Sequence, residues 1–287
     1  MDPIFLVEAA INGILLGGIL ALLALGLNLI FGVIDIVWIA YVDLVALCMY
    51  TVYFLVQVHG WPVWAAGLVA LAVGAVLGVL VHLLVISPIL TSPPVNQLLA
   101  TGGLLFFIQS FATFLWTTDH KSVRLSLPSL EFGGIFLPFT RLIPFVISIL
   151  AMAALYLFLT RTFIGTAIRA VSQDRDATRL MGASPQRVYV VTSAVGGLMA
   201  GLAGALLIFQ YSVHPFFGGQ FGPLTFMICV LGGLGNMVGA FIASFIMSEI
   251  ISVAGVVWST EMGYVIAFVV FIVMIFARPG GILARRQ

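Results

Sequence analysis

Long apolar stretches, interrupted by short polar or glycine- and proline-rich breaks, run along the whole chain. A helix that spans a bilayer needs roughly 20 consecutive, mostly apolar residues. The hydrophobic pattern therefore predicts an all-α, polytopic transmembrane helix bundle with about eight or nine membrane segments. The expected segments cover, approximately, residues 8–33, 35–57, 63–86, 95–117, 141–160, 188–211, 223–231, 237–253 and 261–277.

Composition strengthens this prediction. Of the 287 residues, 62% are hydrophobic and only 7% are charged, whereas a soluble domain carries about 25% charged residues. So few charges cannot cover a water-facing surface, which excludes a soluble globular protein. The first segment carries Glu8, follows Asp2 and lacks a basic leader or a small-residue cleavage site. We interpret it as a retained span and not as a removed signal peptide.

Arginines gather in two parts of the chain, one within residues 161–187 and one within residues 278–286. Cytoplasmic loops of membrane proteins hold the excess of Lys and Arg, so both parts should be cytoplasmic. Counting segments backwards then places the N-terminus outside and the C-terminus in the cytoplasm. The short apolar run 223–231 either crosses the membrane or re-enters it as a half-helix, and the sequence leaves both readings open.

Glycines recur four residues apart in four places. Small residues at this spacing let helix backbones approach closely in lipid. They indicate either close packing inside one bundle or a seam between two chains. The pairs are Gly13/Gly17, Gly74/Gly78, Gly197/Gly201 and Gly235/Gly239.

The stretch 165–182 is too polar to span a membrane, yet it carries helix signals. The pattern predicts Ser172 as the N-cap, with Asp174 in the first turn, where the helix dipole favours an anion. It predicts Gly182 as the C-terminal stop, and Ser184-Pro185 then begins the next helix. These signals predict a short capped helix joined directly to a membrane helix.

This short helix is amphipathic, with Ala177, Leu180 and Met181 on one side and Asp176 and Arg179 on others. An amphipathic helix can dock its apolar face into a groove of a soluble partner. The alternative is an arginine-rich connector that only sets topology, and physical reasoning alone leaves both open.

The same stretch resembles the conserved cytoplasmic loop of ATP-binding-cassette importer permeases of the branched-chain amino acid family, whose pattern is R-A-V-x-Q-D-x-x-A-A-x-L-M-G-I. Further similarity lies in GLNLIFGV (26–33), GGLGNMVGA (232–240) and FARPGGILAR (276–285). The resemblance covers nearly the whole chain and implies a single permease domain over residues 1–287. The residues in register in the loop are Arg169, Ala170, Val171, Gln173, Asp174, Ala177, Leu180, Met181 and Gly182.

The resemblance also implies partners. They are a second, related permease, two ATP-binding cassette subunits and a periplasmic solute-binding protein, in a bacterial inner membrane. Residues 161–187 would be the loop that couples the chain to the ATPase. Because the chain has no G-x-x-x-x-G-K-[ST] phosphate loop, ATP and Mg would be bound by the partners, and this chain is expected to be neither an enzyme nor a cofactor or nucleic-acid binder. The candidate coupling residues are Arg169, Ser172, Asp174, Asp176, Ala177, Arg179, Leu180, Met181 and Gly182.

Polar residues inside the predicted spans are candidates for a solute pathway, because charged groups there are costly and usually functional. Where the family reads N-F-A-H-G-D-L, this chain keeps Ala40, Asp43 and Leu44 but has Trp38 and Tyr41. These aromatic residues either line the pathway or belong to an interfacial belt. The candidate pathway residues are Trp38, Tyr41, Asp43, Thr101, Gly102, Gln109 and Glu249.

The expected cargo is a small polar organic solute, first a branched-chain or related amino acid, with urea, an amide or an aromatic carboxylate as alternatives. A rival class is an ion-coupled secondary transporter that works without ATPase partners. The scarcity of charges within the spans disfavours it. Scattered histidines and two isolated cysteines suggest no metal site.

Overall fold

The computed structural model describes residues 3–123, 129–132, 135–278 and 280–282. Within these ranges the regular secondary structure is helical, apart from an isolated backbone bridge and one antiparallel hairpin between β1 (Ser129–Phe132) and β2 (Ile135–Pro138). The helices are α1 (Pro3–Ile34), α2 (Tyr41–Tyr53), α3 (Val63–Val81), α4 (Ser87–Ile89), α5 (Pro94–Trp116), α6 (Phe139–Arg161), α7 (Phe163–Gln173), α8 (Arg175–Leu180), α9 (Pro185–Leu207), α10 (Phe217–Gly232), α11 (Met237–Val257) and α12 (Thr260–Ala277). Two π-helical turns, Phe54–Val58 and His82–Ile86, extend α2 and α3.

Eight helical stretches in the described ranges are long and apolar enough to cross a membrane. This confirms the predicted all-α polytopic bundle. The stretches are Phe5–Ile34, Tyr41–Val58, Val63–Ile89, Pro94–Trp116, Phe139–Arg161, Pro185–Leu207, Met237–Val257 and Thr260–Ala277.

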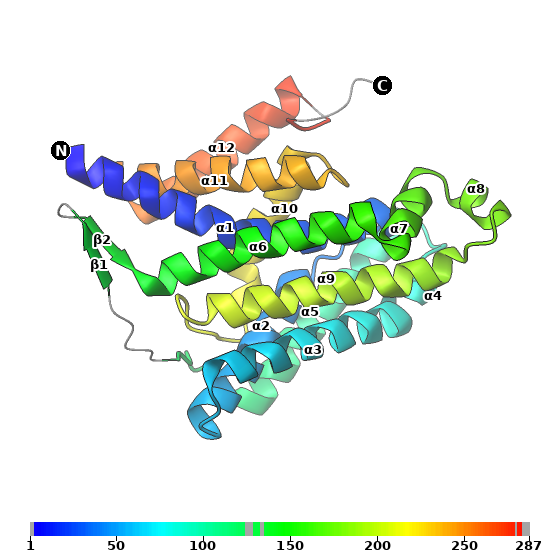
Figure 1. The fold of residues 1–287 in the computed structure, drawn as a ribbon, viewed down its shortest axis with the longest axis horizontal. Coiled ribbons are helices and arrows are strands. Elements are labelled where there is room, and N and C mark those ends of the chain that lie inside the picture. The colour runs from blue at the N-terminus through cyan, green and yellow to red at the C-terminus, as the bar shows by residue number, and fades with distance from the viewer. Residues whose placement is uncertain (1–2, 124–128, 133–134, 279, 283–287) are drawn as a thin grey trace.

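The long helices lie beside one another along the long axis of the molecule (Figure 1). The start of α1 and the β1–β2 hairpin lie at one end, and α7, α8 and the end of α12 lie at the other. The loop between α6 and α9 therefore shares an end of the bundle with the end of α12, as the arginine distribution predicted. Which end faces the cytoplasm stays a prediction.

Helix α1 forms the centre of the bundle. From Ile19 to Leu25 its side chains are almost completely buried, and it contacts α6, α9, α10 and α11. A helix that is hydrophobic on all sides is expected to be surrounded by other helices. Helices α3, α5 and α12, in contrast, expose many large apolar side chains, such as Phe114 and Phe276, as surfaces that face lipid or another protein do.

The glycine pairs pack inside this chain. A side-chain carbon at Gly74 would overlap the backbone of Gly197 and Gly201, and one at Gly78 would overlap the backbone of Ser193. Helices α3 and α9 thus meet along a seam of glycines, where backbones approach closely. The pair in α1 packs against side chains of α11, and the last pair packs against the ends of α1 and α10. The prediction of packing within one bundle is therefore confirmed for all four pairs.

Helix α10 is longer than the predicted run 223–231, since it begins at Phe217. Before it, Val213 forms a backbone bridge with Lys121 near the end of α5. After it, Gly235 lies against Gly32 near the end of α1, at the opposite end of the bundle. The segment therefore passes from one end of the bundle to the other and does not turn back as a half-helix.

Candidate functional site

Between α1 and α2 the chain is broken rather than helical. Asp35 adopts a left-handed φ of +65°, a conformation that Asp tolerates better than most residues. Residues 35–40 have no helical structure, and α2 begins only at Tyr41. The predicted span 35–57 is therefore helical only from Tyr41 onward. Within the non-helical start, Trp38 and Ala40 are buried, at most 1% exposed, whereas Asp35 and Ile39 are exposed.

Helix α5 binds this break through two side chains on one face. The Thr101 hydroxyl donates to the Val37 carbonyl at 3.0 Å, and the Gln109 amide donates to Asp43 Oδ1 at 2.9 Å. Eight residues separate Thr101 from Gln109, which is about two helical turns. The structure thus brings together residues from two spans that the sequence proposed independently.

Asp43 is buried at 1% exposure. Its second oxygen, Oδ2, is buried and has no hydrogen-bond partner among the described residues. The carboxylate lies over Gly218 at the start of α10, where any side-chain carbon would overlap it. Asp43 therefore joins α2, α5 and α10 at one point in the bundle.

Trp38 and Tyr41 form an edge-to-face ring pair with centroids 5.9 Å apart. The Tyr41 hydroxyl donates to the Gly196 carbonyl of α9 at 3.0 Å and fills the space beside Gly26 of α1. Both side chains are almost completely buried. The alternative that they belong to an interfacial belt is wrong, because belt residues face lipid and these are enclosed by helices.

We call Trp38, Tyr41, Asp43, Thr101 and Gln109 the Asp43 cluster. The other two candidate pathway residues lie apart from it. Gly102 is on the neighbouring face of α5, with open space where its side chain would be. Glu249 of α11 faces Gly13 of α1, far along α1 from Gly26, where Tyr41 packs. A pathway role stays a prediction for all seven residues.

The loop between α6 and α9 contains two helices where the sequence predicted one. Helix α7 is capped by Thr162, whose hydroxyl accepts from the Gly165 amide at 3.0 Å. Ser172 is wrong as an N-cap, because it lies in the last turn of α7 and donates to the Arg169 carbonyl. Asp174 is the N-cap of α8 instead of a first-turn residue. Its Oδ1 accepts from the amides of Asp176 and Ala177, both at 2.9 Å.

The predicted C-terminal stop of this helix is confirmed. Gly182 has a φ of +86°, in the left-handed region where glycine ends helices. The next helix, α9, begins with Ser184 as its N-cap residue and Pro185 in its first turn. The prediction that the loop helix is joined directly to a membrane helix is therefore also confirmed.

Helix α8 presents apolar side chains to its surroundings. Leu180 is 89% exposed and Met181 is 87% exposed, while Asp176 and Arg179 form an exposed ion pair at 3.5 Å. Large apolar side chains exposed in pairs are typical of protein contact surfaces.

Arg175 is a functional candidate that the sequence interpretation did not single out. Its guanidinium donates to the Ile34 carbonyl at the end of α1, at 3.0 Å, and lies over the Tyr189 ring of α9 at 5.7 Å. It therefore ties α8 to two membrane helices. Five arginines lie within residues 161–187, and nothing in the local sequence distinguishes Arg175 from the other four.

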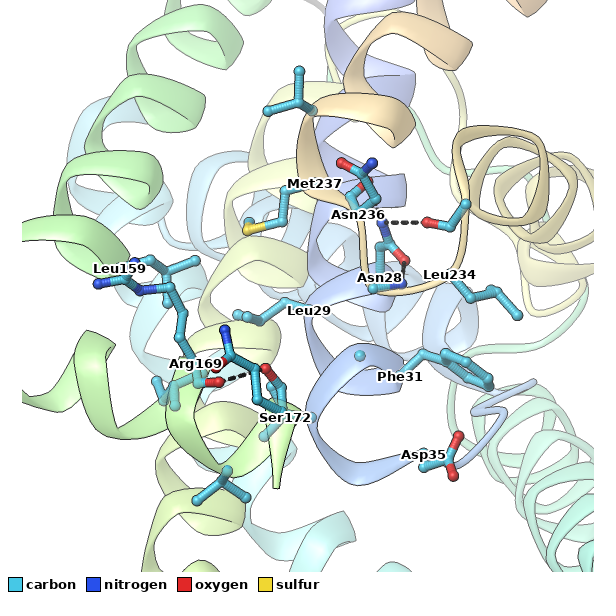
Figure 2. A pocket seen from close by; sticks show the side chains of 18 of the residues that line it. Asn28, Leu29, Phe31, Asp35, Leu159, Arg169, Ser172, Leu234, Asn236 and Met237 are labelled. Carbon is cyan, nitrogen blue, oxygen red and sulfur yellow. Dashed lines mark hydrogen bonds between the residues drawn. The ribbon is translucent and has the colours of Figure 1, made fainter. Parts of the chain in front are cut away.

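Beside the loop lies a cavity of about 1310 Å³, open between α1, α6, α7 and the turn from α10 to α11. Figure 2 shows Arg169, Ser172 and Asp35 around it. Asn28, which the sequence interpretation also missed, accepts from the Gly235 amide at 2.6 Å and donates to the Asn236 carbonyl at 2.9 Å. It fixes the α10–α11 turn to α1 at the wall of the cavity.

Two of the four histidines meet at the other end of the bundle. The rings of His120 and His214 lie 4.5 Å apart. Burial, together with the nearby His120 ring, lowers the pKa of His214. No group of three or more His, Cys, Asp or Glu residues in the described ranges could hold a metal ion.

The family described as "Branched-chain amino acid transport system / permease component" matches residues 9–275. The chain belongs to this family. The match confirms the resemblance identified in the sequence, and with it a permease component of an ATP-binding-cassette importer in the inner membrane.

Relatives of the family match over almost the full length. The high-affinity branched-chain amino acid transport system permease protein LivH of Escherichia coli (strain K12) is 28% identical over 99% of this chain and 97% of its own. The corresponding BraD of Pseudomonas aeruginosa is 26% identical over 98% and 96%. The fructose import permease protein FruF of Bifidobacterium longum is 27% identical over 75% and 63%. No solved structure matches the chain significantly.

Proposed function

We propose that this permease forms half of the pathway by which an ATP-driven importer takes up a branched-chain or related amino acid. The second half comes from a related permease, ATP and Mg are bound by two separate cassette subunits, and a periplasmic binding protein delivers the solute. The observation that carries the proposal is helix α8, which is capped, tied to α1 and α9 through Arg175, and exposes Leu180 and Met181.

The contacts of Arg175 explain how such a loop can transmit force. A partner that binds Leu180 and Met181 pulls on a helix whose arginine holds the last carbonyl of α1. The chain leaves α1 at that carbonyl, crosses the break and reaches Asp43. Movement of α8 can therefore reach the Asp43 cluster through about nine residues of chain.

The cargo proposal rests on the relatives and on chemistry. The two full-length relatives are named for branched-chain amino acid transport. Since FruF is named for fructose import, family membership alone does not select the solute. Urea, amides and aromatic carboxylates are the nearest alternatives.

Coupling is tested by reconstituting the full complex and measuring ATP hydrolysis with the solute-loaded binding protein. The double variant Leu180→Asp, Met181→Asp should abolish stimulation and release the ATPase subunits, because both side chains would lose their apolar contacts. Thr166→Asp, exposed on α7 at the same end, is the matched control. If the double variant retains stimulated hydrolysis, the coupling role is wrong.

Cargo is tested by titrating the cognate binding protein with a solute panel, followed by uptake measurements for the complex. Trp38→Asn with Tyr41→His should change the ratio of uptake rates between solutes if the Asp43 cluster contacts cargo. An equal reduction for every solute would assign these residues a structural role only.

A further inference from the structure

A second cavity, of about 520 Å³, is lined by residues near the starts of α1 and α6. These helix starts lie at the end of the bundle opposite residues 161–187, which we call the coupling loop (Figure 1). Ligand cavities of roughly 300–1,000 Å³ hold small organic molecules. Five helices and the segment that follows α9 contribute to its walls. Its polar lining residues are Glu8, Asn12, Arg141, Gln210, Tyr211, Gln220, Ser252, Thr260 and Tyr264.

One positive and one negative side chain line this cavity without meeting. Arg141 of α6 and Glu8 of α1 form no ion pair with each other or with any other described residue. Arg141 donates one hydrogen bond, to Asn12 at 2.6 Å. A guanidinium has five N–H donors, so others are free to bind an anionic group in the cavity.

Neutral polar groups surround the two charges. The Gln210 side-chain nitrogen is buried and has no hydrogen-bond partner among the described residues. Burial, reinforced by the nearby Tyr264, raises the pKa of Tyr211 to about 12, so its hydroxyl keeps its proton at neutral pH. A buried donor without a partner, such as the Gln210 nitrogen, is rare in folded proteins and requires an explanation.

Apolar side chains complete the walls. Leu16, Ile251 and Val256 line the same cavity from α1 and α11. A cavity with separated opposite charges, amide donors and an aliphatic wall is complementary to a zwitterion that bears an apolar side chain.

We propose that this cavity binds an aliphatic α-amino acid, with Arg141 holding the carboxylate and Glu8 the ammonium group. The choice of an amino acid as ligand rests on the proposed function, whereas the zwitterion chemistry rests on the cavity alone. The site lies at the end predicted to face outward, where a solute would arrive before it reaches the Asp43 cluster.

The test uses the full chain in nanodiscs made only of phosphatidylglycerol, with radiolabelled leucine as the probe. We expect saturable leucine binding, weakened about tenfold or more in Arg141→Gln and in Glu8→Gln, as loss of a charge-assisted hydrogen bond predicts. Arg161→Gln at the other end of the bundle and Glu261→Gln on the first turn of α12 are matched exposed controls. Equal losses in the controls, or no saturable binding by a folded chain, would overturn the proposal.

Competition with leucine analogues assigns the two charges separately. Leucinamide lacks the carboxylate, so Arg141→Gln should leave its binding unchanged while Glu8→Gln weakens it. For 4-methylpentanoate, which lacks the ammonium group, the pattern should reverse. If both variants weaken both analogues equally, the assignment of the charges is wrong.

A zwitterionic lipid headgroup has the same charges as an amino acid. Adding phosphatidylethanolamine to the nanodiscs distinguishes the two sources. If this lipid, and not leucine, raises the melting temperature in a manner that Arg141→Gln abolishes, the cavity is a lipid site and the proposal is overturned.

Failure of this site is separable from failure of the proposed function. Leucine uptake by the full complex with unchanged half-saturation in Arg141→Gln would overturn the site and leave the transport function intact. A chain that binds leucine but never assembles with ATPase subunits would overturn the proposed transport function and leave the site intact.

Discussion

The Asp43 cluster and the coupling loop hold their polar side chains in opposite ways. In the cluster, Gln109 and Asp43 are 66 positions apart and bond inside the bundle. In the loop, Asp174 caps the amides two and three positions ahead of it. The first arrangement exists only when α2 and α5 are assembled, whereas the second can form within a few residues of chain.

This difference has a consequence for tolerance to substitution. A buried polar group that loses its partner suffers the full desolvation penalty, while an exposed cap that is lost can be replaced by water. Substitutions in the cluster should therefore destabilise the bundle, and substitutions in the loop should leave its stability unchanged but impair coupling.

The largest loss of stability is expected for a substitution at Gly218. In Gly218→Val the new side chain would overlap the Asp43 carboxylate, and overpacking of this kind costs about 3 kcal/mol. Gly219→Val is the control, because no atom lies within 4 Å of a side-chain carbon there. Thermal unfolding in detergent should show a large fall in melting temperature for the first variant only. Similar falls for both would mean that Asp43 does not occupy this space.

The next largest loss of stability is expected when the hydrogen bond between Gln109 and Asp43 is removed. Asp43→Ala leaves the Gln109 amide buried without a partner, which costs about 2 kcal/mol. Gln109→Ala removes the other partner, and the double variant Asp43→Ala with Gln109→Ala should be less destabilised than the sum of the two single variants. Chemical denaturation of the four members of this cycle measures the coupling. Strict additivity would show that the two side chains do not interact.

In the loop, Asp174→Ala should destabilise α8 by about 1 kcal/mol through loss of its cap, with no change in the melting temperature of the bundle. Ser172→Ala is the control, because its hydroxyl bonds only within α7. Hydrogen exchange of the Asp176 and Ala177 amides reports on the cap directly. Faster exchange in Ser172→Ala than in Asp174→Ala would restore Ser172 as the capping residue.

The smallest effect is expected for Arg179→Ala. Its ion pair with Asp176 is exposed on both sides, and exposed pairs contribute little to stability. We expect no measurable change in melting temperature or in α8 exchange. A clear destabilisation would show that the loop depends on its surface charges, and the contrast with the Asp43 cluster would then fail.

Much of the architecture was predictable because its causes are local. Each span is indicated by its own run of apolar residues. In lipid such a run must be helical, because its backbone has to satisfy its hydrogen bonds within the segment. Gly182 was recognisable as a helix stop because its position and residue type suffice. The cap was misplaced by two residues, because Ser172 and Asp174 are both good capping residues and local pattern does not choose between them.

What the sequence by itself determined is a bundle of apolar helices with one capped polar loop, because hydrophobic runs and helix ends are encoded by neighbouring residues. Only the tertiary structure decided which residues meet. In the folded chain Gln109 bonds to Asp43, and α3 packs against α9 along a seam of glycines. Helix α10 passes from one end of the bundle to the other. It also placed Arg141 and Glu8 around one cavity. These contacts join positions far apart in the chain, and nothing in the neighbourhood of either position specifies the other.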